Sequence, residues 1–349
     1  MTNHHAPEPR RMYNNVIDDG RCGRRGFVLA TLGLLAGCGG AKAGPSATDS
    51  RSALVPIAPF DLRSSVWMNL HHVLYALVAR GEQVVEAGAE LTRAVEALPE
   101  SERRVMHDAA RAYESYAERD LLFDDALGSV TPSLATTEDD ARPALEPAVE
   151  ALGSALVSAV DVYRARFWSS HDEQNRRWIE RARPLLEAHG AAISARLSKL
   201  YGGSWKPEHI RADVTLVANW SGAYTSLGPV HITIASGDRR NQDAYALEIL
   251  FHEASHAMIR VVRDAIAAEA RRQSVEEPKN LWHALLFYTS GMAVKERLPE
   301  HVLYADREGL FSGPWAKYRP ALAEAWQRYL DGASSFEGAL AATIAAAAR

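Results

Sequence analysis

The residues best suited to chemistry lie within five positions, His252-Glu253-Ala254-Ser255-His256. Helix residues four apart lie one turn apart on the same face, so His252 and His256 can direct both imidazoles at one ion. Neutral imidazole nitrogens suit zinc, at about 2.0–2.1 Å from the metal. Glu253 lies on the flank of that face, where its carboxylate can act as general base toward an activated water without being a ligand. The spacing therefore predicts a zinc centre with hydrolytic chemistry.

The surroundings of the motif favour this interpretation over its alternative, two histidines on a solvated helix face. The apolar residues Leu247, Leu250 and Phe251 can bury the helix that carries the motif. A β-rich segment comes directly before it. We expect the pair to lie on a buried helix beside a sheet.

The motif His252-Glu-Ala-Ser-His256 resembles the active-site helix of the zincin metallopeptidases, over residues 212–300. The resemblance implies a small sheet whose edge strand pairs with the substrate backbone by strand addition. The strand expected at 230–236 is the candidate edge. A looser resemblance, to uncharacterised exported bacterial lipoproteins, rests on the motif and on segments 219–224 and 281–291. It implies no substrate.

A catalytic zinc site needs a third protein ligand. The best candidate is His283, 27 positions after His256, at the start of an apolar helix that can return antiparallel to the motif helix. The alternative for His283 is a core histidine bonded to a backbone carbonyl. Rival ligands are Glu296, Glu276 and Glu277. The metzincin continuation, a Gly and a third His soon after the motif, is absent, and so is the Glu near position 292 expected in a gluzincin.

Other side chains are candidates for completing the site. Zinc hydrolases need a donor aimed at the oxyanion that develops on the attacked carbonyl. Tyr304 is our candidate for that donor, with Tyr318 and Arg307 as alternatives; each can equally be a core or surface residue. Glu248, one turn before His252, is a candidate for orienting a ligand.

Four further polar residues are weaker candidates for the site. Asn219 and Tyr224 are candidates for lining the cleft. The adjacent pair His71-His72 cannot chelate one ion, because neighbouring helix residues point about 100° apart. We expect these two histidines to be core residues with satisfied hydrogen bonds.

The elements that must position these residues are mostly helical. Apolar spacing predicts helices at about 66–97, 101–122, 145–167 and 173–201, with a turn-rich interruption at about 128–140. Alternation at 214–218 and 230–236 predicts strands, and the chain is expected to be helical from Gln242 onward. The expected fold class is α+β, predominantly helical, with a small sheet preceding the motif helix.

The first forty residues have the layout of an export signal. Arg24-Arg25 precede a short apolar stretch that ends in Leu35-Ala36-Gly37-Cys38. The paired arginines resemble a twin-arginine signal, and the last four residues resemble the bacterial lipobox, which implies acylation of Cys38. The expected segments are a signal peptide at 1–37, a flexible tether at 38–52, a helical region at 53–207 and a zincin-like metal-binding region at 208–349.

Composition excludes other classes of protein. The chain has 349 residues, 39 basic against 44 acidic, and a net charge of −5, which argues against nucleic-acid binding. Of its two cysteines, Cys22 lies in the predicted signal peptide and Cys38 is the expected acylated first residue, which argues against a disulfide scaffold and against cysteine catalysis. We expect an exported zinc hydrolase, most simply a peptidase acting on peptides or proteins, anchored to a bacterial membrane through Cys38 on the periplasmic or cell-surface side. The alternative is a noncatalytic surface lipoprotein with a zincin-like binding domain.

Overall fold

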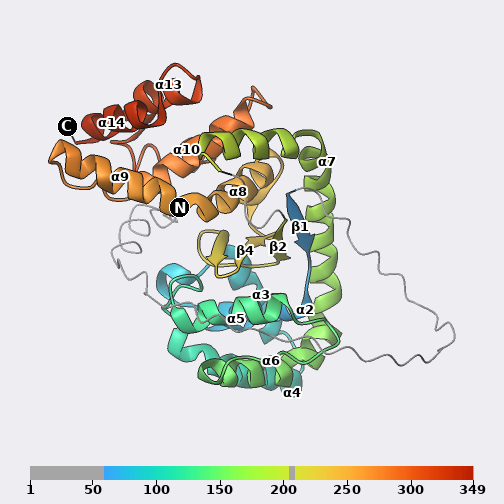
Figure 1. Cartoon of the computed structure of the whole chain (residues 1–349). Coiled ribbons are helices and arrows are strands. Elements are labelled where there is room, and N and C mark those ends of the chain that lie inside the picture. The colour runs from blue at the N-terminus through green and yellow to red at the C-terminus, as the bar shows by residue number, and fades with distance from the viewer. Residues whose placement is uncertain (1–58, 204–208, 349) are drawn as a thin grey trace, which may run out of the picture. The chain divides into compact units, whose positions relative to one another are not determined.

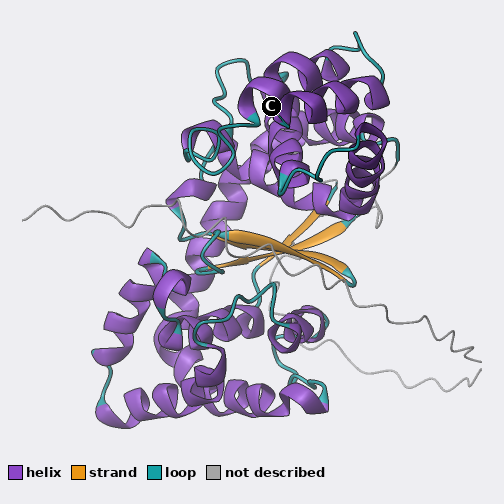
Figure 2. Cartoon of the chain, turned by 90° about the vertical axis from the view of Figure 1, so that its left-hand side faces the viewer, coloured by secondary structure: helices purple, strands orange, loops and turns teal. Residues whose placement is uncertain are grey.

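The computed structural model describes residues 59–203 and 209–348, which belong to one compact unit. Helices dominate, and the strands form one four-stranded sheet, so the predicted α+β, predominantly helical class is confirmed (Figure 1). The strands are β1 (Phe60–Arg63), β2 (Ile210–Thr215), β3 (Ala223–Leu227) and β4 (Val230–Ala235). Figure 2 shows the sheet between two groups of helices.

The sheet order is β1-β2-β4-β3, with β1, β2 and β4 parallel and β3 antiparallel to β4. The prediction that segment 230–236 is the edge strand is therefore wrong, because β4 pairs on both sides. The strand at that edge is β3, a short and partly polar segment that local alternation does not reveal. Local patterns also miss β1, since its partner β2 begins 150 residues later in the sequence (Phe60 pairs with Ile210). The predicted regions 53–207 and 208–349 thus contribute strands to one sheet.

Cross-strand partners point to the same face of a sheet. Tyr224 pairs with Thr233, and its hydroxyl lies 2.9 Å from His72 of α2 (Val66–Val78), so this face is toward the N-terminal helices. The neighbouring residue Thr225 points to the opposite face, where it contacts α8 (Ala244–Ser255). The sheet therefore separates the motif helix from α2, whereas the long helix α7 (Ser169–Leu200) contacts α8 directly.

The N-terminal helices follow the predicted stretches with local differences. The stretch predicted at 66–97 divides into α2 and α3 (Glu86–Glu96) around Gly81, whose φ of +59° is incompatible with a continuous helix. The predicted interruption at 128–140 is partly wrong, because α5 (Asp125–Ala135) forms there. The Asp124 side chain caps its first turn by accepting hydrogen bonds from two backbone N–H groups. The other elements of this half are η1 (Gly81–Gln83), α4 (Glu100–Ala110), η2 (Arg111–Tyr116), η3 (Pro147–Val149), α6 (Glu150–Tyr163), η4 (Arg164–Trp168) and α7 (Ser169–Leu200).

The chain after the sheet is helical, as predicted. The motif helix α8 is followed by the short turn η6 (His256–Met258) and by α9 (Ile259–Gln273), and α10 (Leu281–Lys295) packs on α8. The remaining elements are η5 (Arg239–Asn241), α11 (Tyr304–Arg307), α12 (Arg319–Ala321), η7 (Leu322–Trp326), α13 (Gln327–Leu330) and α14 (Phe336–Ala347).

The predicted export signal, the lipobox with Cys38 and the tether lie outside the described residues. Within the described part of the chain, no helix combines the length and apolar character needed to cross a bilayer.

Candidate metal centre

Three histidines from two helices meet on the α8 side of the sheet. One ring nitrogen each of His252, His256 and His283 lies within 4.8 Å of the other two, an arrangement that can hold a metal ion. The Nε2 atoms of His252 and His283 are 3.2 Å apart. The structure thus brings the predicted third ligand to the motif pair.

The packing of α10 on α8 explains this convergence. His283 lies near the start of α10 and meets the C-terminal end of α8, while Gly291, two turns later, lies against Glu248. The two helices are therefore antiparallel, as the sequence suggested. A Cβ at Gly291 would come within 2.7 Å of the Glu248 carboxylate and of the Leu303 side chain, so glycine permits this close approach.

The motif helix changes geometry at its second histidine. The α-helix α8 ends at Ser255, and His256 begins the 3-10 turn η6. The rings of His252 and His256 nevertheless lie 5.0 Å apart, centroid to centroid. The i, i+4 juxtaposition predicted from the sequence is preserved.

The donor set fits a cation such as zinc. Two nitrogens of a tetrahedral zinc site lie about 3.3 Å apart, given bonds of about 2.0–2.1 Å, and the His252–His283 separation matches this value. Burial lowers the pKa of His256 to about 4, and burial together with the neighbouring imidazoles holds the pKa of His252 and His283 well below 6.5. All three rings are therefore neutral at pH 7, the form that binds metal.

Glu253 lies beside the histidine cluster and is itself only 6% exposed. One carboxylate oxygen, Oε2, accepts a hydrogen bond of 2.7 Å from the Thr225 hydroxyl and lies 3.9 Å from His256 Nε2. Burial raises the pKa of Glu253 to about 7, and the Thr225 hydrogen bond opposes that rise. A carboxyl group with this pKa can both take and return a proton near neutral pH.

Aromatic rings enclose the three imidazoles. Phe287 stacks on His252 at 3.5 Å between ring centroids, and Trp282 stacks on His283 at 4.6 Å. Trp315 lies 5.6 Å from Phe287 and 5.2 Å from His283, again between ring centroids. Such an apolar enclosure strengthens electrostatic interactions within the site.

The rival ligands do not join the cluster. Glu296 forms an ion pair of 2.9 Å with Arg196, and Glu276 and Glu277 are exposed in the segment between α9 and α10. Among the described residues, the metal-binding group contains the three histidines and none of these carboxylates.

The candidates for an oxyanion donor have different surroundings. Tyr304 is buried, and its ring lies 5.6 Å from Phe287, which in turn covers His252. Its role as donor remains a prediction. The Tyr318 hydroxyl donates to the backbone carbonyl of Lys279, and the Arg307 guanidinium lies 3.9 Å from the centroid of the Tyr245 ring.

Glu248 does not contact a metal-binding histidine through a hydrogen bond, contrary to the prediction. Its Oε2 pairs with His301 Nε2 at 2.5 Å and accepts from the Tyr304 backbone N–H at 2.9 Å. The carboxylate therefore ties α8 to the segment that leads into α11. Sequence reasoning missed His301, because its partner lies 53 positions earlier.

The residues proposed to line the cleft contact the N-terminal half of the chain instead. Tyr224 bonds to His72 Nε2, and the Asn219 amide lies 3.4 Å from the Asp120 carboxylate, so the prediction for both is wrong. His72 is a satisfied core histidine, as predicted, with its Nδ1 bonded to the Met68 carbonyl. His71 bonds to the Tyr113 hydroxyl through Nδ1, while its Nε2 has no partner among the described residues.

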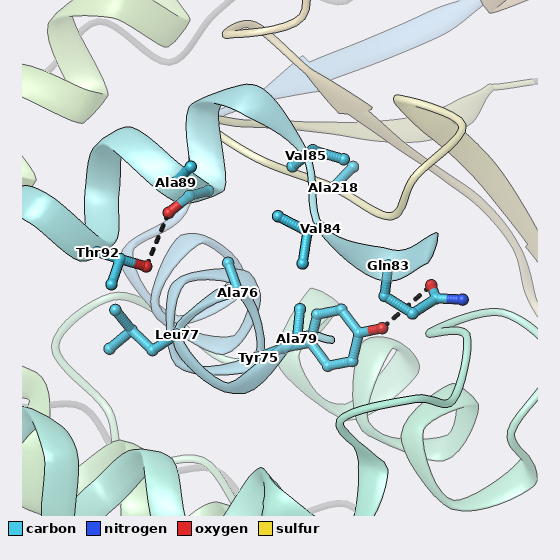
Figure 3. Close-up of a pocket in the computed structure, with 11 residues that line it drawn as sticks. Tyr75, Ala76, Leu77, Ala79, Gln83, Val84, Val85, Ala89, Thr92 and Ala218 are labelled. Carbon is cyan, nitrogen blue, oxygen red and sulfur yellow. Dashed lines mark hydrogen bonds between the residues drawn. The ribbon is translucent and has the colours of Figure 1, made fainter. Parts of the chain in front are cut away.

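A cavity of about 270 Å³ lies elsewhere, between α2, α3 and the segment that joins them (Figure 3). Its lining is mostly aliphatic, and its hydroxyl groups are those of Tyr75, which donates to Gln83, and Thr92, which donates to the Gly88 carbonyl. Among the described residues, no histidine, cysteine or acid lines this cavity. The cavity therefore offers no metal ligand and no general base of its own.

Comparison with known proteins adds no relative: no protein-family model, no curated sequence and no solved structure matches this chain.

Proposed function

We propose that this protein is a zinc-dependent hydrolase, most simply a metallopeptidase. The observation that carries the proposal is the convergence of His252, His256 and His283 with the Glu253 carboxyl beside them. Three neutral imidazoles are a common ligand set for catalytic zinc, which leaves a position for substrate or water. Zinc held there supplies a Lewis acid that polarises a carbonyl and lowers the pKa of water.

Glu253 is the proposed general base. It takes a proton from the attacking water and returns it to the leaving amine, which requires a pKa near the working pH. Its position on the flank of the cluster, 3.9 Å from His256 Nε2, supports this role. Tyr304 remains our candidate for the oxyanion donor, next to the ring that covers His252.

The edge strand β3 supports a peptide as substrate. It pairs with β4 on one side and contacts α8 and η6. An extended peptide can add to such an edge through backbone hydrogen bonds, and the Thr225 hydrogen bond connects this strand to Glu253. The proposed substrate is therefore an extended peptide or protein segment. We further propose export and anchoring to a bacterial membrane through acylated Cys38.

The experiment is to measure zinc content and peptide hydrolysis on the same samples. Purified wild type should contain one zinc per chain and cleave a pool of internally quenched peptides. Glu253→Gln should keep its zinc and lose turnover. Stoichiometric zinc without turnover in the wild type would instead favour a noncatalytic binding protein, and absence of zinc uptake would remove the proposal.

A further inference from the structure

The Thr225 hydroxyl connects the edge strand of the sheet to the proposed general base. Its oxygen lies 2.7 Å from Glu253 Oε2 and 2.9 Å from the Glu253 backbone carbonyl oxygen. Both partners belong to a single residue of α8, and Thr225 itself is buried on β3. A hydroxyl has one hydrogen to donate, so the two contacts share it.

The position of Thr225 on β3 is fixed by the sheet. Thr225 pairs with Ile232 of β4, and side chains alternate between the faces of the strand. The neighbouring Tyr224 therefore points to the N-terminal helices while Thr225 points to α8. The alternation thus aims the Thr225 hydroxyl, and not that of Tyr224, at the Glu253 carboxylate.

The two oxygens of the Glu253 carboxyl are not equivalent. Oε2 is occupied by Thr225, and Oε1 accepts no hydrogen bond from the described residues. Held through Oε2, the carboxyl has few orientations available, and Oε1 is the atom left for an incoming water.

We propose that Thr225 is a positioning residue for Glu253, and that it holds Oε2 so that Oε1 performs the proton transfers of the reaction. This inference rests on the proposed hydrolase function. Oε1 accepts a proton from water as the water oxygen bonds to the substrate carbonyl carbon. The same proton then passes from Oε1 to the amine nitrogen as the carbon–nitrogen bond breaks. Oε2 remains an acceptor for Thr225 in both steps, so the carboxyl does not have to reorient between them.

The test compares Thr225→Val, which removes the hydroxyl and keeps the shape, with Thr225→Ser, which keeps the hydroxyl. The matched control is Thr233→Val, a buried threonine on β4 that pairs with Tyr224 and therefore lies on the face of the sheet opposite Glu253. Each zinc-loaded variant is assayed on the internally quenched peptide pool, with zinc content and melting temperature measured on the same sample.

We expect Thr225→Val to lower kcat by about 10- to 100-fold, the range for a hydrogen bond to a charged group. KM, zinc content and melting temperature should stay close to those of Thr233→Val, and Thr225→Ser should recover most of kcat. In a Glu253→Gln background, Thr225→Val should cause no further loss, because the group it positions is no longer a base.

Each failure has its own signature. If Glu253→Gln abolishes turnover but Thr225→Val matches Thr233→Val, the role of Thr225 is overturned and the proposed function stands. The role of Thr225 is also overturned if Thr225→Ser is as impaired as Thr225→Val, or if Thr225→Val loses zinc, since the effect is then structural. If the zinc-loaded wild type turns over none of the pool, the proposed function and the role of Thr225 both fall.

Discussion

Removing His283 tests whether three histidines act as one metal site. The cluster is assembled only in the folded chain, from buried His252 and the partly buried His256 and His283, so an ion binds the folded state in preference to the unfolded one. At free zinc about 1,000 times the dissociation constant, such binding stabilises the fold by about 4 kcal/mol. For a folded part of this size that corresponds to a rise in melting temperature of about 6–7 °C.

The His283→Ala variant should lose most of that rise. Outer partners of metal ligands alone are worth about 10- to 100-fold in affinity, so loss of a ligand should weaken zinc binding by at least about 100-fold. At the same free zinc the stabilisation then falls to about 1.4 kcal/mol, or a rise of about 2 °C. For each variant the melting temperature of the chelated protein is subtracted from that of the zinc-loaded protein. The contacts with Trp282 and Trp315 that the substitution removes are missing from both samples, so their loss does not affect the difference.

The assay is differential scanning calorimetry with zinc buffered by a chelator. The control is His209→Ala, an exposed histidine, which should keep the full rise. Two results would refute the reasoning: no zinc-dependent change in wild-type melting temperature, or an equal change in wild type and His283→Ala.

Three further predictions concern the proposed general base Glu253, the buried His72, and the ion pair between Glu248 and His301. Glu253→Gln should reduce peptide turnover by about 100- to 10,000-fold with zinc content unchanged, measured by initial rates and metal analysis; unchanged turnover would remove Glu253 as the base. Burial lowers the pKa of His72 to about 4, so the fold favours its neutral form, and the stability that His72 contributes is full above about pH 6.5 and declines toward pH 4. In urea unfolding between pH 7 and 5, the wild type should lose about 2 kcal/mol more than a His72→Gln variant. His301→Ala leaves Glu248 buried without its main partner and should lower the free energy of unfolding by about 3–5 kcal/mol. Glu296→Gln, which breaks an exposed ion pair, should lower it by less than about 1 kcal/mol. Equal losses would contradict a stabilising role for the buried pair.

Local patterns were sufficient where the chemistry depends on neighbours in the sequence. The i, i+4 spacing placed His252 and His256 together, and an apolar run after a histidine was enough to predict an antiparallel helix carrying His283. The first inference holds because helical periodicity converts sequence spacing directly into direction in space, and the second because α10 packs antiparallel on α8.

The failures involve contacts between distant segments. The strand β1 is short, and its pairing with β2 closes a long loop that no local pattern reveals. The strand β3 is partly polar, so its place at the edge, and with it the contact from Thr225 to Glu253, depends on the register of the whole sheet. Glu248 lies one turn from His252, yet its partners are His301 and the backbone N–H of Tyr304 at the start of α11, which sequence spacing does not bring near it.

Zinc K-edge X-ray absorption on the zinc-loaded protein tests directly whether His252, His256 and His283 bind one metal ion. We expect three imidazole nitrogens at about 2.0–2.1 Å from the metal, falling to two in His283→Ala while His209→Ala keeps three. A wild-type spectrum without imidazole scattering, or one that His283→Ala leaves unchanged, would contradict this expectation.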